Sequence, residues 1–186
     1  MSAQNYTYAE LAGATPEAPL LFAFHGTGGD EHQFLELGPQ LVPGARLIAP
    51  RGDVSEGGAL RYFKRLAEGR YDMADLERAT GKMAAFVRAH APEGAPSRVA
   101  GFGYSNGANI LASVQFASPE LFDSAVLLHP LIPFDPGVVP GLAGKRVLIT
   151  AGRRDPIAPV HSAELLAAYL KDQGAEVTVF WHEGGH

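Results

Sequence analysis

Residues 98–112 read Arg-Val-Ala-Gly-Phe-Gly-Tyr-Ser-Asn-Gly-Ala-Asn-Ile-Leu-Ala, the most informative segment of the chain. An apolar run typical of a strand leads into the pattern G-x-S-x-G, and a helical pattern follows at once. A turn this sharp strains the serine backbone, and a side chain two positions before or after it would obstruct the turn. We therefore predict that Ser105 is a nucleophile; the alternative is a serine that only caps the first turn of a helix.

Other short apolar runs lie between glycine, proline or polar turns, at residues 20–24, 45–49, 124–128, 146–150 and 177–181, and residues 6–11 add a candidate edge strand. Near-continuous apolarity is typical of strands buried on both faces of a parallel sheet. Helical patterns at residues 72–89, with Asp72 as N-cap, 106–116 and 160–170 alternate with these runs. The sequence therefore predicts an α/β fold with a mostly parallel central sheet, helices on both faces, and ligands at the carboxyl ends of the strands.

Two further candidates for catalysis follow predicted strands. Asp155 comes shortly after the run at residues 146–150, and His186 follows the run at 177–181. Ser105, Asp155 and His186 thus occur in the order nucleophile, acid, base, which is the chain order of the α/β-hydrolases. Taken singly, Asp155 could cap the following helix and His186 could be a frayed chain end. Together they predict a catalytic triad at one edge of the sheet.

A glycine-rich loop, His25-Gly26-Thr27-Gly28-Gly29-Asp30, follows the predicted strand at residues 20–24. It is similar to the HGGG-type loop that supplies a backbone N–H to an oxyanion hole. We expect the amides of Thr27 and Asn106 to bind the developing oxyanion, and His25 to brace the loop. A phosphate-binding loop is the alternative, but no Gly-Lys-Ser/Thr follows.

The segment His182-Glu183-Gly184-Gly185-His186 matches the zinc-protease pattern H-E-x-x-H. That pattern binds a metal only on a helix, where residues i and i+4 share one face. A predicted strand leads into the segment and its two glycines disfavour a helix, so we predict no metal site. The other histidines have no metal-like spacing, although His129, at a strand end, could line the pocket.

Composition sets limits on class and location. The length of 186 residues predicts one domain, residues 1–186, and the net charge of -5 without a Lys/Arg run argues against a nucleic-acid partner. No leader or long apolar segment is present, so we expect a cytoplasmic protein without stable membrane insertion. The absence of cysteine excludes a thiolate nucleophile, which leaves serine for covalent chemistry.

Beyond these separate motifs, the chain resembles the phospholipase/carboxylesterase branch of the α/β-hydrolase superfamily, and within it bacterial carboxylesterases associated with hydroquinone dioxygenases. The resemblance covers residues 18–186 and rests on residues 25–31, 50–52, 61–65 and 103–109, on Gly152, Asp155 and Pro156, and on Gly185 and His186. It implies a serine esterase without a cofactor, acting on short-chain or small aromatic esters. It also makes His25, Arg61, Phe63 and Tyr104 candidate substrate contacts.

Similar proteins carry one more helix after the catalytic histidine, whereas this sequence ends on His186. An uncovered apolar sheet face is unfavourable in water, so we expect either a longer natural chain or a covering partner, such as a second copy in a homodimer. Thioesterase, acyltransferase or lysophospholipase activity would use the same triad. A non-catalytic α/β-hydrolase that only binds a ligand is the alternative from another class.

Overall fold

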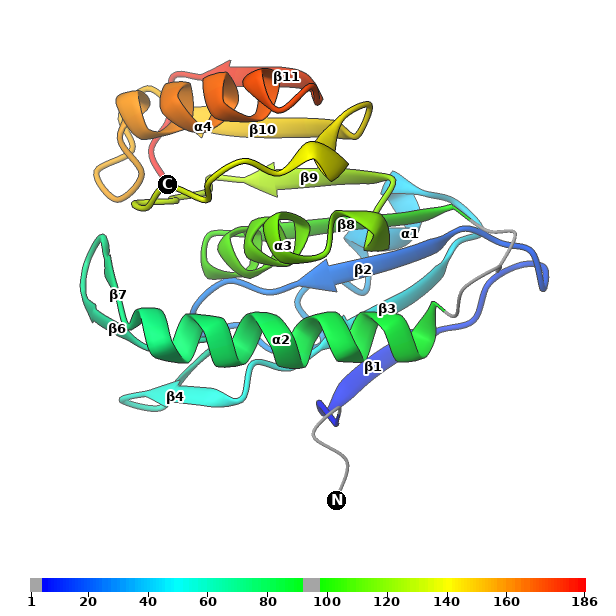
Figure 1. The fold of residues 1–186 in the computed structure, drawn as a ribbon. Coiled ribbons are helices and arrows are strands. Elements are labelled where there is room, and N and C mark those ends of the chain that lie inside the picture. The colour runs from blue at the N-terminus through cyan, green and yellow to red at the C-terminus, as the bar shows by residue number, and fades with distance from the viewer. Residues whose placement is uncertain (1–4, 92–97) are drawn as a thin grey trace.

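The computed structural model describes residues 5–91 and 98–186. Within them, seven strands form one sheet in the order β1-β3-β2-β8-β9-β10-β11 (Figure 1). The strands are β1 (Tyr8–Leu11), β2 (Leu20–Phe24), β3 (Arg46–Pro50), β8 (Val99–Tyr104), β9 (Ser124–Leu128), β10 (Arg146–Gly152) and β11 (Glu176–His182). Strand β1 pairs antiparallel with β3, and the other neighbours pair in parallel. The predicted sheet and its edge strand are confirmed.

The helices are α1 (Leu37–Leu41), α2 (Met73–His90), α3 (Asn106–Ala117) and α4 (Val160–Asp172), with 3₁₀ turns at Pro119–Leu121 and Pro140–Leu142. The three predicted helices end within two residues of the observed bounds. As predicted, Asp72 caps α2, since its carboxylate accepts a hydrogen bond from the Asp75 amide at 3.0 Å. Among the described residues, no helix combines the length and apolarity needed to cross a membrane.

Two hairpins between β3 and α2 were not predicted. Strand β4 (Val54–Glu56) pairs with β5 (Ala59–Arg61), and β6 (Arg65–Ala67) pairs with β7 (Arg70–Tyr71). The first turn uses Gly57 and Gly58 at φ 58° and 91°, which glycine adopts without strain. The hairpins bring Arg61 and Arg65 to the carboxyl edge of the sheet, beside Ser105.

Side chains of the central strands alternate between two apolar layers. Phe22 and Phe24 of β2 pack in one cluster with residues of α2, α3 and α4, whereas Leu21 and Ala23 pack on the opposite face, against Leu37 of α1. Figure 1 shows α2, α3 and α4 in front of the sheet and α1 behind it. Helices therefore cover both faces, as predicted, and every residue of β2 is buried.

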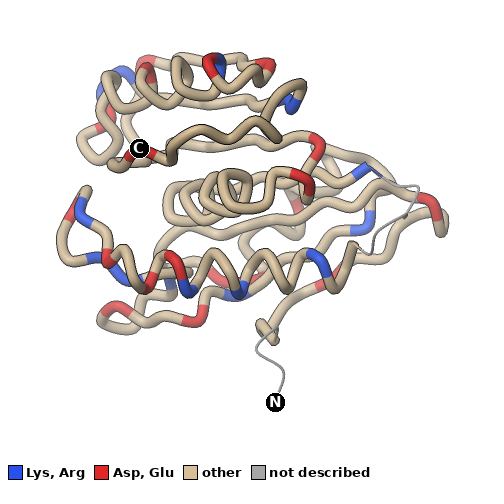
Figure 2. The backbone as a smooth tube through the Cα atoms, in the orientation of Figure 1, with Lys and Arg blue, Asp and Glu red and all other residues tan. Residues whose placement is uncertain are grey.

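Strand β11 is covered on one face more than on the other. Val177 and Val179 pack into the core cluster that contains residues of α4, while Phe180, on the opposite face, is 60% exposed. Acidic and basic residues are interspersed along α2 and the hairpins (Figure 2). The outer side of β11 thus leaves an apolar side chain facing solvent.

Candidate active site

Ser105 lies on the turn between β8 and α3, with φ at 53°. This left-handed conformation is costly for a residue other than glycine, and such strain is concentrated at functional sites. The Ser105 amide donates to the Leu128 carbonyl at 2.9 Å, which ties the turn to β9. A Cβ at Gly103 would overlap the main chain at Gly107, so the first flanking glycine is required for steric reasons, as the sequence pattern indicates.

Gly107→Ala is expected to lower both stability and activity. A Cβ at Gly107 would overlap the carbonyl oxygens of Phe24 and His25, and main-chain atoms cannot move aside as a flexible side chain can. We expect a loss of about 1–3 kcal/mol in the free energy of unfolding from overpacking. Displacement of Ser105 should also lower kcat/KM about 10²-fold.

The matched control for this substitution is Gly81→Ala in α2, where a new Cβ would have no neighbour within 4 Å. There alanine should stabilise the helix by about 0.5–1 kcal/mol. Urea denaturation and ester hydrolysis of both variants test the expectation. Equal midpoints and equal activities for wild type and Gly107→Ala would show that the turn tolerates a side chain.

The three residues predicted as a triad come together. Ser105 Oγ lies 2.8 Å from His186 Nε2, and His186 Nδ1 lies 2.8 Å from Asp155 Oδ2. Tyr104 donates its hydroxyl hydrogen bond to the main-chain oxygen of His186 at 2.8 Å, and its ring lies against the His186 ring. The imidazole is therefore held between a hydroxyl and a carboxylate, with a tyrosine to fix its backbone.

The Asp155 carboxylate has no exposed surface, and hydrogen bonds occupy both of its oxygens. Oδ1 accepts from the amides of Ile157 and Ala158 at 2.8 and 2.9 Å, while Oδ2 faces His186. Asp155 therefore caps the following turn with one oxygen and contacts His186 with the other. Burial by itself raises the pKa of this carboxyl, but hydrogen bonds from the Ala158 amide and from histidines outweigh it and hold the pKa below its usual range. The carboxylate is ionised at neutral pH.

The glycine-rich loop lies beside Ser105. The hydrogen bonds of the described residues leave the amides of Thr27 and Asn106 unpaired, as binding an oxyanion requires. Arg61 Nη1 donates to Thr27 Oγ1 at 2.7 Å, so Arg61 holds this loop in place. The Asn106 side chain accepts from the Tyr62 amide at 2.8 Å through Oδ1, which anchors the start of α3.

His25 begins this loop and is 1% exposed. Its Nε2 accepts from the Gly52 amide at 2.8 Å, so its Nδ1 carries the hydrogen that is donated to the Gly26 carbonyl at 2.7 Å. Burial lowers the pKa of His25, which keeps the ring neutral. The His25 ring thus joins the glycine-rich loop to the segment after β3, in line with the bracing role expected from the sequence.

The pocket at Ser105 is small, with a cavity volume of about 20 Å³. Its lining combines residues of the hairpins, α3 and the strand ends: Arg61, Arg65, Glu68, Tyr71, Ser105, Asn106, Asn109, His129, Leu131, Ile157 and His186. Arg61, one of the candidate substrate contacts, is 3% exposed and faces this pocket. Phe63, another candidate, is fully buried and packs against Tyr71, which lines the pocket.

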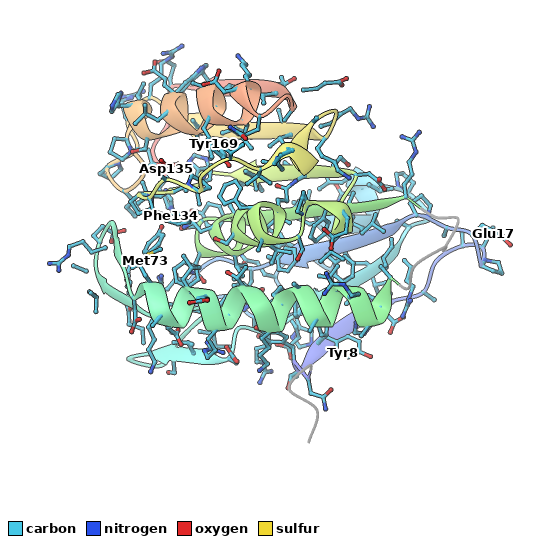
Figure 3. The ribbon with its side chains drawn as sticks, in the orientation of Figure 1. Tyr8, Glu17, Met73, Phe134, Asp135 and Tyr169 are labelled. Atoms are coloured by element: carbon cyan, nitrogen blue, oxygen red, sulfur yellow. The ribbon has the colours of Figure 1, made fainter. Side chains whose placement is uncertain are left out.

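A larger cavity of about 500 Å³ lies between the loop after β9 and α4, and it shares no lining residue with the pocket at Ser105. Figure 3 shows Phe134, Asp135 and Tyr169 close together there. Its lining has no nucleophile paired with a base. We therefore place the chemistry at the smaller pocket, on the grounds of its functional groups.

His129, which the sequence suggested could line the pocket, does so and also contacts Asp155, while His182 contacts His129. His129 Nδ1 is 3.1 Å from Asp155 Oδ2, and His182 Nε2 is 3.0 Å from His129 Nε2. Nitrogens of His129 and His186 and an oxygen of Asp155 lie within 4.8 Å of one another, as metal ligands do. In the hydrogen-bonded arrangement, both nitrogens that face the carboxylate carry hydrogens and donate to it. His182 ends β11 and the residues after it are not helical, so the H-E-x-x-H pattern lacks the helix expected of a zinc site.

Proteins similar to this chain include members of a hydrolase family. The dienelactone hydrolase family matches residues 62–186, more than half of the chain. MhqD of Bacillus subtilis (strain 168), named as a hydrolase, is 42% identical over 169 residues, which cover 90% of this chain and 84% of MhqD.

Two solved structures are also similar. Atu2452 of Agrobacterium tumefaciens str. C58, a protein of unknown function, is 52% identical with a TM-score of 0.90, covering 100% of this chain and 91% of its own. A Bacillus cereus carboxylesterase is 38% identical with a TM-score of 0.91, covering 97% of this chain and 86% of its own. The chain therefore belongs to the dienelactone hydrolase family and is a hydrolase of the α/β-hydrolase fold.

Proposed function

We propose that this protein is a serine carboxylesterase that hydrolyses short-chain or small aromatic esters through an acyl-enzyme. The observation that carries the proposal is the pair of 2.8 Å contacts from Ser105 Oγ to His186 Nε2 and from His186 Nδ1 to Asp155 Oδ2. This geometry is that of an activated nucleophile with an oriented base. The carboxylesterase name of the Bacillus cereus relative supports the ester class.

In the proposed reaction, Ser105 Oγ attacks the acyl carbon as His186 Nε2 takes the hydroxyl proton. The amides of Thr27 and Asn106 stabilise the oxyanion, each contributing about 3 kcal/mol. His186 then gives its proton to the leaving alcohol, which departs and leaves the acyl group on Ser105. A water molecule, deprotonated by His186, attacks this acyl-enzyme and releases the acid. The Asp155 carboxylate stabilises the imidazolium in both halves of the reaction.

The size of the pocket predicts a preference for small acyl groups. A cavity of about 20 Å³ has room for little more than one water, so long acyl chains require the hairpin side chains to move. We expect kcat/KM to fall at least about tenfold from p-nitrophenyl acetate to p-nitrophenyl octanoate. A loss of this size is typical when one or two methylene groups do not fit a pocket.

Steady-state hydrolysis of the acetate, butyrate and octanoate esters tests this preference. A matched series of acetyl and octanoyl thioesters separates the acyl preference from the leaving group. A higher kcat/KM for octanoate than for acetate would contradict the assignment to short esters, and faster turnover of thioesters would assign the site to thioester cleavage.

A further inference from the structure

A chain of hydrogen bonds that ends at Asp155 fixes which ring nitrogen carries the hydrogen in neutral His182 and in neutral His129. The Gly184 amide donates to His182 Nδ1 at 3.0 Å, so the ring hydrogen of neutral His182 must be on Nε2. His182 Nε2 faces His129 Nε2 at 3.0 Å, which makes His129 Nε2 the acceptor. The hydrogen of neutral His129 is then on Nδ1, where it is donated to Asp155 Oδ2 at 3.1 Å. Each assignment follows from the donor before it, beginning at a backbone amide that can only donate.

Two imidazoles therefore share one carboxylate oxygen. Asp155 Oδ2 accepts from His186 at 2.8 Å and from His129 at 3.1 Å. In the transition state His186 becomes a cation that needs the charge of Asp155. A protonated His129 would form an ion pair with the same oxygen and repel the His186 cation. The proposed catalysis accordingly requires a neutral His129.

Several ionisable groups face His129. Tyr104 of β8 lies edge-on to its ring, and Asp155, His182 and His186 approach from the loop after β10, from β11 and from the residues after β11. Burial is the main cause of the lowered pKa of His129, and the hydrogen bond to Asp155 opposes it. Burial and Asp155 raise the pKa of Tyr104, so this phenol is uncharged. The pocket adds the charged side chains of Arg61, Arg65 and Glu68.

The backbone holds this arrangement rigidly. His129 has φ at 53°, and its amide donates to the Thr150 carbonyl at 3.0 Å, so a strained residue is fixed at the end of β9. His182 is fixed as well, since its carbonyl accepts from the Arg153 amide at 2.8 Å. A Cβ at Gly152 would overlap the Gly184 carbonyl, so the turn that supplies the amide to His182 packs directly on β10.

We propose that His129 and His182 are positioning residues for the proposed triad. The His182 Nε2–H group donates to Nε2 of His129, the one basic nitrogen of that ring, so His129 stays neutral and donates to Asp155. The negative charge of Asp155 then stabilises the His186 cation. The proposal rests on the proposed function, because it concerns the transition state of that reaction. It assigns a role to the first histidine of the H-E-x-x-H segment, which the triad does not use.

The test uses the pH dependence of activity in His182→Phe and His129→Asn. Phenylalanine keeps the ring volume at position 182 and removes the donor to His129. Asparagine places an amide near the former Nδ1, tolerates a positive φ and cannot be protonated. His161→Phe, on the exposed side of α4, is the matched control.

We expect His182→Phe to shift the acid limb of kcat/KM for p-nitrophenyl acetate upward by about half a pH unit or more, because the uncapped His129 then competes for protons. Adding His129→Asn to this variant should return the limb to its wild-type position, since no competing imidazole is left. The rate of reaction with a fluorophosphonate, which requires only an activated serine, should shift in the same way. His161→Phe should not move the limb.

Two results would overturn the positioning role: an acid limb in His182→Phe that coincides with wild type, or a shift that persists in the double variant. A uniform loss of rate at all pH values, with no shift, would indicate a structural role for His182 and would also contradict the proposal. Wild-type protein that reacts with neither ester nor fluorophosphonate would remove the proposed function itself. Wild-type reactivity together with an unshifted His182→Phe would remove only the positioning role.

Discussion

Ser105→Ala is expected to lower kcat for p-nitrophenyl acetate by about 10⁴- to 10⁶-fold, the range seen when a serine nucleophile is removed. The Ser105 hydroxyl lies 2.8 Å from the only nitrogen of His186 that is free to take its proton, since the other nitrogen faces Asp155. Alanine removes the attacking oxygen and leaves the oxyanion amides in place. The remaining rate should therefore come from binding and oxyanion stabilisation alone.

The control for this change is Ser113→Ala, which removes a hydroxyl from the same helix. The Ser113 side chain donates to the Asn109 carbonyl at 2.8 Å, within α3 itself. We expect this variant to keep kcat within about threefold of wild type, because the lost hydrogen bond contributes only about 1 kcal/mol to folding. Thermal unfolding checks that both variants are folded. Ser105→Ala with most of the wild-type kcat would refute covalent catalysis by this serine.

Asp155→Asn is expected to reduce kcat about 10⁴-fold while the protein stays folded. The asparagine oxygen can keep the two hydrogen bonds from Ile157 and Ala158. Its amide nitrogen would then face His186 Nδ1 and His129 Nδ1, both of which carry hydrogens. His186 must shift its hydrogen to Nε2, and that nitrogen can no longer accept the serine proton.

The lowered pKa of Asp155 makes a separate prediction about stability in acid. A carboxyl with a depressed pKa in the folded state stabilises the fold above its unfolded pKa, and this contribution is lost as the pH falls through the folded value. Asp155→Asn should therefore lose less stability than wild type on acidification, measured by urea unfolding at several pH values. The control is Asp135→Asn, because the Asp135 carboxylate accepts from the local Gly137 amide.

The kcat of Asp155→Asn has its own contradicting outcome. A value within tenfold of wild type would exclude the Asp155 carboxylate as the partner of His186.

The strands could be predicted because a strand that is buried on both faces consists almost entirely of apolar residues. Residues 20–24 are apolar throughout, and in the structure both faces of β2 are covered. The edge strand β1 (Tyr8–Leu11) lies within the run predicted at residues 6–11, although two of its four residues are exposed and the other two are only half-buried. Helices α2 and α3 were predicted from the spacing of apolar residues and from the Asp72 cap.

The hairpins between β3 and α2 were missed because their residues pair with each other and bury little apolar surface. Strand β4 contains Val54, Ser55 and Glu56, and two of the three side chains are exposed. The Gly57-Gly58 dipeptide between β4 and β5 was the available signal, since paired glycines favour a tight hairpin turn. Helix α1 contains five residues, with a glycine and a proline among them, and gives no helical period.

The positions of Ser105, Asp155 and His186 after predicted strands were enough to place them at one edge of the sheet, because the carboxyl ends of parallel strands all lie at that edge. The same rule applies to His129, which follows β9, and to His182, which ends β11. Their roles could not be predicted, since hydrogen-bond direction depends on a backbone amide at Gly184 and on the register of β10 with β11. The signal that the sequence offered was a histidine at the end of a predicted strand, at the same edge of the sheet as the predicted acid.

Covalent labelling identifies the residue that attacks the substrate. Wild-type protein should be treated with a fluorophosphonate until esterase activity is lost, then digested and analysed by mass spectrometry. We expect a single covalent adduct on the peptide that contains Ser105, formed in proportion to the loss of activity. Loss of activity with Ser105 unmodified, or an adduct on another residue, would contradict it.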